Sequence, residues 1–312
     1  MRVLITGGAG FIGSHLAAHF CRRSEVRVLD NLRTGFRRNL DGLRAEFLEG
    51  SILDAALVRQ AVTGVDYVFH LAATVSVPES FRNPLECEQV NVAGFLNVLE
   101  AAAAAHVKKL CLASSSAVYG DSLEIPKREE MAPDPRSPYA VSKLAGEYYA
   151  ALFAGAYGLP TVCPRFFNVF GARQDPASPY AAAVPAFISR ALRNEPLTIF
   201  GDGEQTRDFV SVRDVVAACD RLTLASDATG VFNVAAGGRM TISSLAREVV
   251  RLTASRSEIR HLPPRPGDVR HSQASIDRLL ATGFRPAMDF PAALAETIEF
   301  CRGEGQALGS GS

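Results

Sequence analysis

The stretch TGGAGFIGSHL at residues 6–16 decides the fold. It follows a short apolar run, RVLIT at 2–6, and leads into a segment whose apolar residues recur at helical spacing. Gly7, Gly10 and Gly13 stand three residues apart, and the stretch also matches G-x-G-x-x-G from Gly8. Glycines there allow a tight turn and let backbone N–H groups approach a pyrophosphate at a helix N-terminus. Strand, glycine loop and helix together predict a dinucleotide site.

The second strand-like run, EVRVLD at 25–30, ends in Asp30. A carboxylate at this place accepts hydrogen bonds from the adenosine ribose hydroxyls, which favours NAD over NADP. Arg33 follows closely, and an arginine nearby is the usual receptor of the 2′-phosphate of NADP. We predict NAD on the strength of Asp30.

Further strand-like runs at 45–50, 65–73, 108–116 and 160–171 alternate with helical patterns. Continuously apolar strands in that alternation predict a Rossmann-type doubly wound parallel sheet, assigned to a domain at residues 1–171. From 172 to 307, more Pro and Gly and helices expected at 184–194, 212–225 and 241–253 indicate a smaller C-terminal α/β lobe that binds substrate. We expect the chain to cross between the lobes. Residues 308–312 have the composition of a flexible linker.

Composition narrows the class of protein. The 312 residues are 47% apolar, and 33 basic residues balance 33 acidic ones, so there is no basic field for nucleic acid. No run is apolar and long enough for a membrane span, and the N-terminus lacks a secretory signal pattern. Six scattered cysteines without metal spacing predict reduced thiols and no metal site. We expect a cytoplasmic protein.

Tyr139 and Lys143 in SPYAVSKLAGE (137–147) stand at positions i and i+4, on one helix face. An ammonium group near a phenol favours the phenolate form, so the pair can serve as a general acid and base between alcohol and ketone. Y-x-x-x-K alone is common in surface helices. When Y-x-x-x-K follows a dinucleotide-binding motif and the serine-rich strand end LASSSAVYG (112–120), the motif predicts a catalytic pair.

Five motifs together, TGGAGFIG, DNLRTG, HLAA, SSSAVYG and YAVSK, resemble the extended short-chain dehydrogenase/reductase family. The resemblance continues through RFFNVFGARQDP (165–176), FGDGEQTRDFV (200–210) and PPRPGDVRHSQA (263–274), and so covers essentially the whole chain. Within the family the chain looks most like the UDP-glucose/UDP-N-acetylglucosamine 4-epimerases. One departure is Ser51, where family members usually carry Asp for the adenine amino group. Ile52 follows as expected.

The resemblance implies catalytic roles for Ser115, Tyr139 and Lys143, with Ser115 orienting the sugar O4 and Ser114 on the nicotinamide side. Related 4,6-dehydratases carry Asp-Glu directly after the hydroxyl residue, and decarboxylases keep the glutamate. Here Ser116 and Ala117 stand instead, which removes the machinery of both reactions. The implied cofactor-binding set is Gly7, Gly10, Phe11, Ile12, Gly13, Asp30, Asn31, Thr34, Gly35, Ser51, Ile52, Leu71, Ala72, Ala73, Asn91, Ser114, Tyr139, Lys143 and Phe166.

The resemblance also implies a UDP-sugar substrate, with arginines on the diphosphate, Asp268 on the nucleotide ribose and mostly backbone contacts to the base. Ser272 stands where a bulky tyrosine would disfavour N-acetyl groups, so we expect UDP-GlcNAc/UDP-GalNAc to be accepted alongside UDP-Glc/UDP-Gal. The implied substrate-binding set is Ser76, Val77, Ser115, Asn168, Gln174, Ala183, Val184, Thr198, Ile199, Phe200, Arg207, Phe209, Arg265, Asp268 and Ser272.

A homodimer is implied as well, formed by a four-helix bundle of the helix around 90–105 and the Tyr139 helix. Two other readings stay open. One is an epimerase or reductase of another nucleotide sugar, such as a uronate or a dTDP- or CDP-hexose. The other is a non-catalytic NAD-sensing protein, against which the retained Tyr139 and Lys143 argue.

Overall fold

A computed structural model describes residues 1–176, 182–224, 228–264 and 270–309. Its main sheet is parallel throughout, in the order β12-β7-β5-β4-β1-β2-β3, with the short β6 also paired to β7. The order turns back beside β1, which creates the switch point where parallel sheets bind ligands. The strands are β1 Arg2–Thr6, β2 Glu25–Asp30, β3 Ala45–Glu49, β4 Tyr67–His70, β5 Lys109–Leu112, β6 Ser114–Ser115, β7 Thr161–Phe166 and β12 Gly230–Val234.

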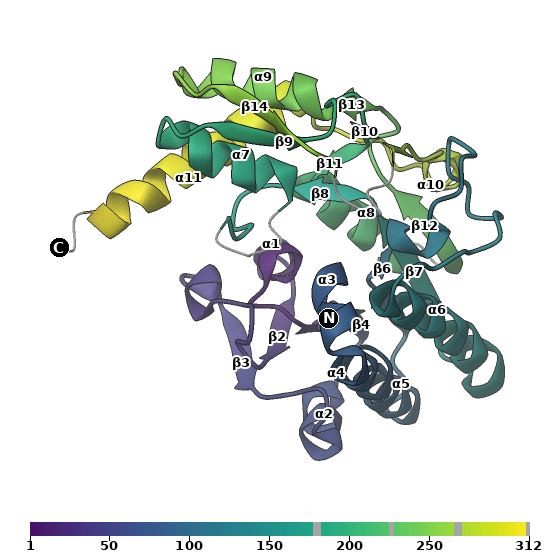
Figure 1. The fold of residues 1–312 in the computed structure, drawn as a ribbon. Coiled ribbons are helices and arrows are strands. Elements are labelled where there is room, and N and C mark those ends of the chain that lie inside the picture. The colour runs from purple at the N-terminus through teal and green to yellow at the C-terminus, as the bar shows by residue number, and fades with distance from the viewer. Residues whose placement is uncertain (177–181, 225–227, 265–269, 310–312) are drawn as a thin grey trace.

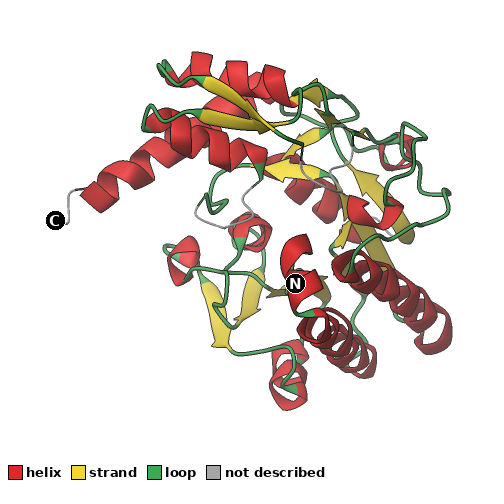
Figure 2. Ribbon diagram, in the orientation of Figure 1, coloured by secondary structure: helices red, strands yellow, loops and turns green. Residues whose placement is uncertain are grey.

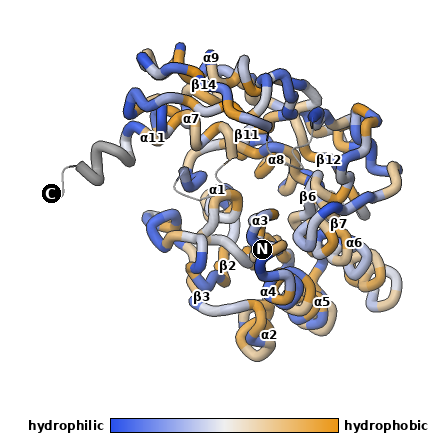
Figure 3. The backbone as a smooth tube through the Cα atoms, viewed as in Figure 1, coloured by the Kyte–Doolittle hydropathy of each residue, from blue (hydrophilic) through white to orange (hydrophobic). Residues whose placement is uncertain are grey.

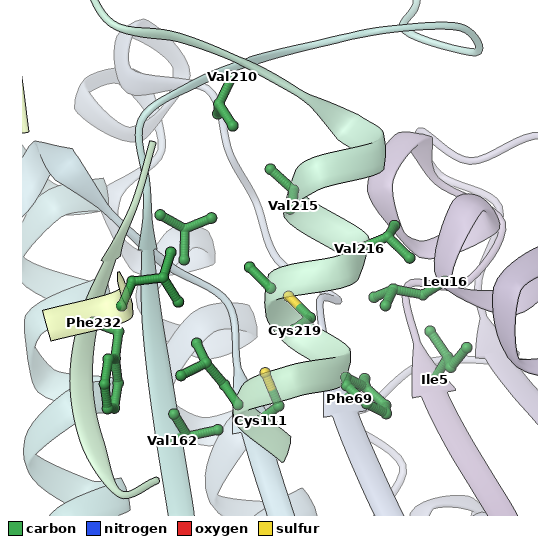
Figure 4. Close-up of a cluster of buried hydrophobic side chains, with 14 of the residues drawn as sticks. Ile5, Leu16, Phe69, Cys111, Val162, Val210, Val215, Val216, Cys219 and Phe232 are labelled. Carbon is green, nitrogen blue, oxygen red and sulfur yellow. The ribbon is translucent and has the colours of Figure 1, made fainter. Parts of the chain in front are cut away.

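Helices cover both faces of this sheet (Figures 1 and 2). One core lies under α1 and α8, and Figure 4 shows its side chains, among them Ile5, Leu16 and Cys219. A second core lies under α2, α5 and α6 on the other face. Because both faces are covered, the strands carry apolar residues continuously rather than alternately. The helices are α1 Phe11–Phe20, α2 Ala55–Val62, α5 Gly94–Ala104, α6 Pro138–Tyr157 and α8 Val212–Leu224.

Short helical segments follow the strand ends. Ser76 caps α3, because its hydroxyl accepts a hydrogen bond from the Glu79 N–H. Figure 3 shows apolar and polar residues alternating along α4 and α5, as in helices that turn one face to a core. These segments are η1 Arg37–Leu40, α3 Val77–Arg82, α4 Pro84–Glu88, the π-helical turn η2 Gln89–Ala93 and η3 Ser116–Tyr119.

The C-terminal lobe has its own core, formed by α7, α9 and α11 around β9. Between the lobes lie two small sheets, β11-β8 and β13-β10-β15, and β14 pairs with β9. The elements are β8 Asn168–Phe170, α7 Ala183–Leu192, β9 Leu197–Phe200, β10 Thr206–Arg207, β11 Phe209–Ser211, β13 Met240–Thr241, α9 Ile242–Thr253, β14 Ile259–Leu262, β15 His271–Ser272, α10 Asp277–Ala281 and α11 Phe290–Gly309.

The predicted doubly wound parallel sheet is confirmed, with local differences. The run at 160–171 is two strands, since β7 ends at Phe166 and β8, which begins at Asn168, pairs with β11 instead of the main sheet. β12, from beyond residue 171, completes the main sheet, so the chain crosses between the lobes. In the part of the chain that the structure describes, no helix is both long and apolar enough to cross a lipid bilayer.

Candidate active site

The glycine loop between β1 and α1 has no space for side chains. Gly7 has φ +70°, and a Cβ on it would lie 2.6 Å from the Ala72 amide nitrogen. A Cβ on Gly13 would lie 2.2 Å from the Gly7 carbonyl oxygen. No side chain caps the first turn of α1, so its N–H groups stay available to an anion. A backbone cradle that a Cβ would fill fits the pyrophosphate of a dinucleotide.

Asp30, at the end of β2, joins two loops of this cradle. Its carboxylate oxygens accept hydrogen bonds from the Ala9 N–H at 2.9 Å and the Leu32 N–H at 2.8 Å. Each carboxylate oxygen can accept a further bond, so the group can also receive ribose hydroxyls. The other residues predicted near the cofactor lie at the same edge: Phe11 and Ile12 in α1, Asn31, Thr34 and Gly35 after β2, Leu71, Ala72 and Ala73 after β4, and Phe166 at the end of β7.

The loop after β4 is held from two sides. The Thr6 hydroxyl is hydrogen-bonded to Nδ1 of His70 at 2.8 Å, and burial lowers the pKa of His70 to about 3, so the ring stays neutral. Asn91, in the π-helical turn, accepts from the Thr74 N–H at 2.7 Å and donates to the Ser142 hydroxyl at 2.9 Å. It therefore ties the loop to α6.

On the adenine side, Ser51 does not replace the carboxylate that the family usually carries. Its hydroxyl accepts from the Leu53 N–H at 3.1 Å, within its own loop. Ile52 is buried, and its carbonyl accepts from the Asn97 side chain at 3.0 Å.

Ser115, Tyr139 and Lys143 come together at the end of β6. Ser137 caps α6 by accepting from the Ala140 N–H, which starts the helix just ahead of Tyr139. The Ser115 and Tyr139 hydroxyls are hydrogen-bonded. The Lys143 ammonium lies 5.8 Å from the centre of the Tyr139 ring and donates to the Ala113 carbonyl at 2.9 Å.

Burial dominates the electrostatics of this trio. It raises the pKa of Tyr139, against which the Ser115 hydrogen bond acts in the opposite direction. It lowers the pKa of Lys143 from 10.5 to about 8, so the group is still an ammonium at neutral pH. The positive charge of Lys143 is held on the same helix face as Tyr139, and an ammonium near a phenol favours the phenolate, so the pair can exchange a proton with a bound hydroxyl.

The small sheets between the lobes bring predicted substrate residues into pairs. The β11–β8 register sets Phe209 opposite Asn168, and the β10–β15 register sets Arg207 opposite Ser272. Asp208, which sequence reasoning missed, lies between them. It is buried and accepts from the N–H groups of Ala236 and Ala274, and burial raises its pKa to about 6.

The other predicted substrate residues are more dispersed. Ile199 is buried in the C-terminal core, whereas Thr198 and Phe200 on either side are partly exposed. Gln174 donates to the Val169 carbonyl, and its buried Oε1 has no hydrogen-bond partner among the described residues. Ala183 and Val184 begin α7, and Ser76 and Val77 begin α3. Arg265 and Asp268 lie outside the described residues.

The sequence profile of the NAD dependent epimerase/dehydratase family matches residues 3–235. The chain belongs to this family. It is 36% identical to the UDP-glucose 4-epimerase of Mycolicibacterium smegmatis over 98% of this chain and 100% of that protein. A solved UDP-N-acetylglucosamine 4-epimerase from Methanobrevibacter ruminantium, in complex with UDP-N-acetylmuramic acid, is 40% identical with TM-score 0.94 and coverage of 97% and 98%. A Thermus thermophilus UDP-glucose 4-epimerase in complex with NAD is 38% identical with TM-score 0.90 and coverage of 97% and 99%.

As a member of this family, the chain is an enzyme that uses NAD, and the predicted family and cofactor are confirmed. The structure also explains why Arg33 is not evidence for NADP binding. Its guanidinium forms an ion pair with Glu86 and lies 3.8 Å from a carboxylate oxygen of Glu79. An arginine committed to carboxylates is poorly available to a 2′-phosphate.

Sequence reasoning missed a buried ion pair beside the predicted catalytic trio Ser115, Tyr139 and Lys143. Glu147, one turn beyond Lys143 on α6, binds the guanidinium of Arg165 on β7 through both carboxylate oxygens. Ser114, expected beside the nicotinamide, donates its hydroxyl to the same carboxylate. The signal in the sequence was the continuation of the Tyr139–Lys143 spacing by another four residues to an acidic side chain.

Proposed function

We propose that the chain is a UDP-sugar 4-epimerase that inverts C4 of UDP-hexoses through a transient 4-keto sugar. The observation that carries this proposal is the hydrogen-bonded Ser115–Tyr139 pair beside the Lys143 ammonium, at the edge of a sheet that bears an NAD cradle. Relatives named 4-epimerases over nearly their full length support it.

The residues after Ser115 favour epimerisation over the other reactions of the family. The two positions that carry Asp and Glu in dehydratases hold Ser116 and Ala117 here, inside the η3 turn. Neither side chain can protonate a leaving 6-hydroxyl or remove the C5 proton at neutral pH. Inversion at C4 needs neither step.

In the proposed reaction, Tyr139 takes the proton from the sugar O4 while Ser115 holds that oxygen in line. The Lys143 ammonium, 5.8 Å from the centre of the Tyr139 ring, would stabilise the phenolate, whereas burial raises the pKa of Tyr139. A bound NAD would supply the hydride acceptor for C4 and, once reduced, the donor that returns the hydride to the opposite face of the sugar. Tyr139 then gives the proton back, and the chain ends the cycle unchanged.

For the substrate, we propose a UDP-hexose whose diphosphate meets Arg207 and Asn168. Arg207 lies opposite Ser272 in the β10–β15 register, so the diphosphate and the sugar 2-substituent would share one wall. The small Ser272 leaves space for an N-acetyl group, which favours UDP-GlcNAc/UDP-GalNAc in addition to UDP-Glc/UDP-Gal. We carry over Arg265 and Asp268 from the family resemblance alone.

The experiment is anion-exchange chromatography after purified protein has been incubated with UDP-GlcNAc and, separately, with UDP-Glc, without added NAD. The C4 epimer should appear in both tubes, and Tyr139→Phe should lose most of the rate while still binding NAD. The Ser272→Tyr variant should lower the rate with UDP-GlcNAc relative to UDP-Glc. Absence of product in both tubes after NAD is supplied would reject the 4-epimerase.

The experiment also separates the other readings. A reductase of another nucleotide sugar would consume reduced cofactor in proportion to product, which its absorbance reports. An NAD-sensing protein would keep its function in Tyr139→Phe. A protein that epimerises UDP-Glc briskly and UDP-GlcNAc not at all would keep the proposed reaction and overturn the assignment of Ser272.

We also propose a homodimer formed through α6 and the helical segments that pack on it. Val141, Tyr148 and Leu152 of α6 are exposed apolar side chains. The neighbouring α3 and α4 add Phe81 and Leu85, the latter 79% exposed. Side chains of this size on adjoining helices are typical of a helix-to-helix interface.

A further inference from the structure

A buried carboxylate, a guanidinium and a hydroxyl form one hydrogen-bonded group behind the catalytic residues. Nε and Nη2 of Arg165 donate to the two carboxylate oxygens of Glu147 at 2.9 and 2.7 Å. The Ser114 hydroxyl donates to Oε1 of Glu147 at 2.5 Å. All three residues are at least 95% buried. Such a pair is rigid, because its fork geometry leaves few alternative arrangements.

This group holds the strand end that carries Ser115 from both sides. Ser114 directly precedes Ser115, and the β6–β7 register sets Ser114 opposite Arg165. Beyond Ser115, the η3 turn ends at Tyr119, whose ring lies 4.7 Å from the Arg165 guanidinium carbon. The Tyr119 hydroxyl donates to Oδ1 of Asn233 at 2.6 Å, so that end is fixed as well.

The same group holds the helix that carries the catalytic base. Tyr139, Lys143 and Glu147 stand at i, i+4 and i+8 of α6 and share one face. The Glu147–Arg165 pair therefore joins the helix of Tyr139 to β7, and Ser114 joins the same carboxylate to β6. A shift of about 1 Å between reacting groups can cost about 100-fold in rate. This connection therefore acts on the distance between Tyr139 on α6 and Ser115 on β6.

We propose that Ser114, Glu147 and Arg165 are positioning residues that set the geometry of the Ser115–Tyr139 hydrogen bond. The consequence for turnover rests on the proposed function, whereas the geometry itself does not. The single donor of the Ser114 hydroxyl is used by Glu147, so Ser114 can act on the geometry of the site through that carboxylate.

Ser114→Ala is the variant of choice. Removing Glu147 or Arg165 would leave a buried charge without its partner, which is strongly destabilising and would threaten the fold. Thr161→Val is the matched control. Thr161 is equally buried, and its hydroxyl donates to the Ala150 carbonyl of the same helix, further from Tyr139. Ser114→Thr keeps a hydroxyl and serves as the rescue.

Each variant is studied with NAD bound. The titration of Tyr139 is followed by tyrosinate absorbance, as the difference from the same variant carrying Tyr139→Phe. In Ser114→Ala we expect the pKa of Tyr139 to rise, because the Ser115 hydrogen bond that lowers it is loosened. We expect kcat for UDP-GlcNAc to fall about tenfold with KM unchanged. Ser114→Thr should restore both values, and Thr161→Val should lose stability but keep both.

Three results would overturn the proposal: an unshifted Tyr139 titration in Ser114→Ala, an equal shift in Thr161→Val, or a loss of bound NAD without any shift. The last result would assign Ser114 to the cofactor instead. A wild-type protein that epimerises neither sugar, combined with a shifted titration in Ser114→Ala, would support the positioning group and reject only the proposed function.

Discussion

At the scale of single residues, the predicted catalytic group Lys143 lowers the stability of the fold. Burial lowers its pKa from 10.5 to about 8, which corresponds to about 3 kcal/mol of penalty for the charged form. The hydrogen bond to the Ala113 carbonyl offsets about 1 kcal/mol of it. In NAD-free protein at pH 7, we therefore expect Lys143→Met to unfold with a free energy about 2 kcal/mol higher than wild type, and to be inactive.

The pH dependence gives the check on this prediction. Between pH 8 and 10.5 the unfolded chain binds more protons at Lys143 than the folded chain does. The contribution of this site therefore makes the free energy of unfolding of the wild type rise with pH. The difference in free energy of unfolding between Lys143→Met and wild type should thus be largest below pH 8 and shrink toward pH 10.5. Urea unfolding at pH 7 and pH 10 measures it. A constant difference between the two proteins would contradict the assigned cause.

The residues found from sequence are those whose signal is local. Tyr139 and Lys143 stand one helical turn apart, and Asp30 ends a strand that follows a glycine loop. Glu147 and Asp208 were missed because a buried carboxylate is recognised by its partners, and those come from distant segments. Asp208, for instance, accepts from the Ala236 and Ala274 N–H groups.

At the scale of elements, an ion pair between Arg33 and Glu86 joins the loop after β2 to α4. Arg33 binds Glu86, and both are exposed by about 40% or more, so the pair contributes little to stability. Because Arg33 lies close to Asp30 in the sequence, this ion pair also bears on the choice between NAD and NADP. Glu86→Gln should free the Arg33 charge for a 2′-phosphate and reduce the preference for NAD over NADP about fivefold.

Cofactor titrations of NAD-free protein measure this preference as the ratio of the two dissociation constants. Adding Arg33→Met to Glu86→Gln should return the ratio to its wild-type value, because the freed charge is then absent. The exposed pair of Arg251 and Glu248 on α9 supplies the control, Glu248→Gln. An unchanged ratio in Glu86→Gln would mean that Asp30 alone sets the choice.

Helices and strands were predicted well where the apolar periodicity and the signals for both ends lie within the element itself. The predicted helix at 212–225 is α8 at 212–224, since its apolar periodicity and both ends lie in the segment. The run at 160–171 was taken as one strand. Its second part pairs with β11, and an apolar run carries no information about the partner it will find forty residues later.

At the scale of the whole molecule, the connection between lobes decides where the substrate residues stand. β12 and α8 return from beyond residue 171 to the main sheet and its core, so the two small sheets lie where the chain crosses. Sequence motifs predicted Arg207, Ser272, Asn168 and Phe209 as one group. Only the pairing of these short strands puts them side by side, because strands of two or three residues have no periodic signal of their own.

The proposed dimer is tested at this scale. Leu152 is 61% exposed on α6, at the face that also carries Tyr148. A buried lysine at an apolar helix interface would cost several kcal/mol, so Leu152→Lys should yield a species with the mass of one 33.4 kDa chain in light scattering. Leu123→Lys, in a loop and 93% exposed, should leave the dimer intact. Because the catalytic trio lies within one chain, the Leu152→Lys monomer should still bind NAD. If both variants have the wild-type mass, the interface lies elsewhere or the wild type is a monomer, and its own mass decides between the two.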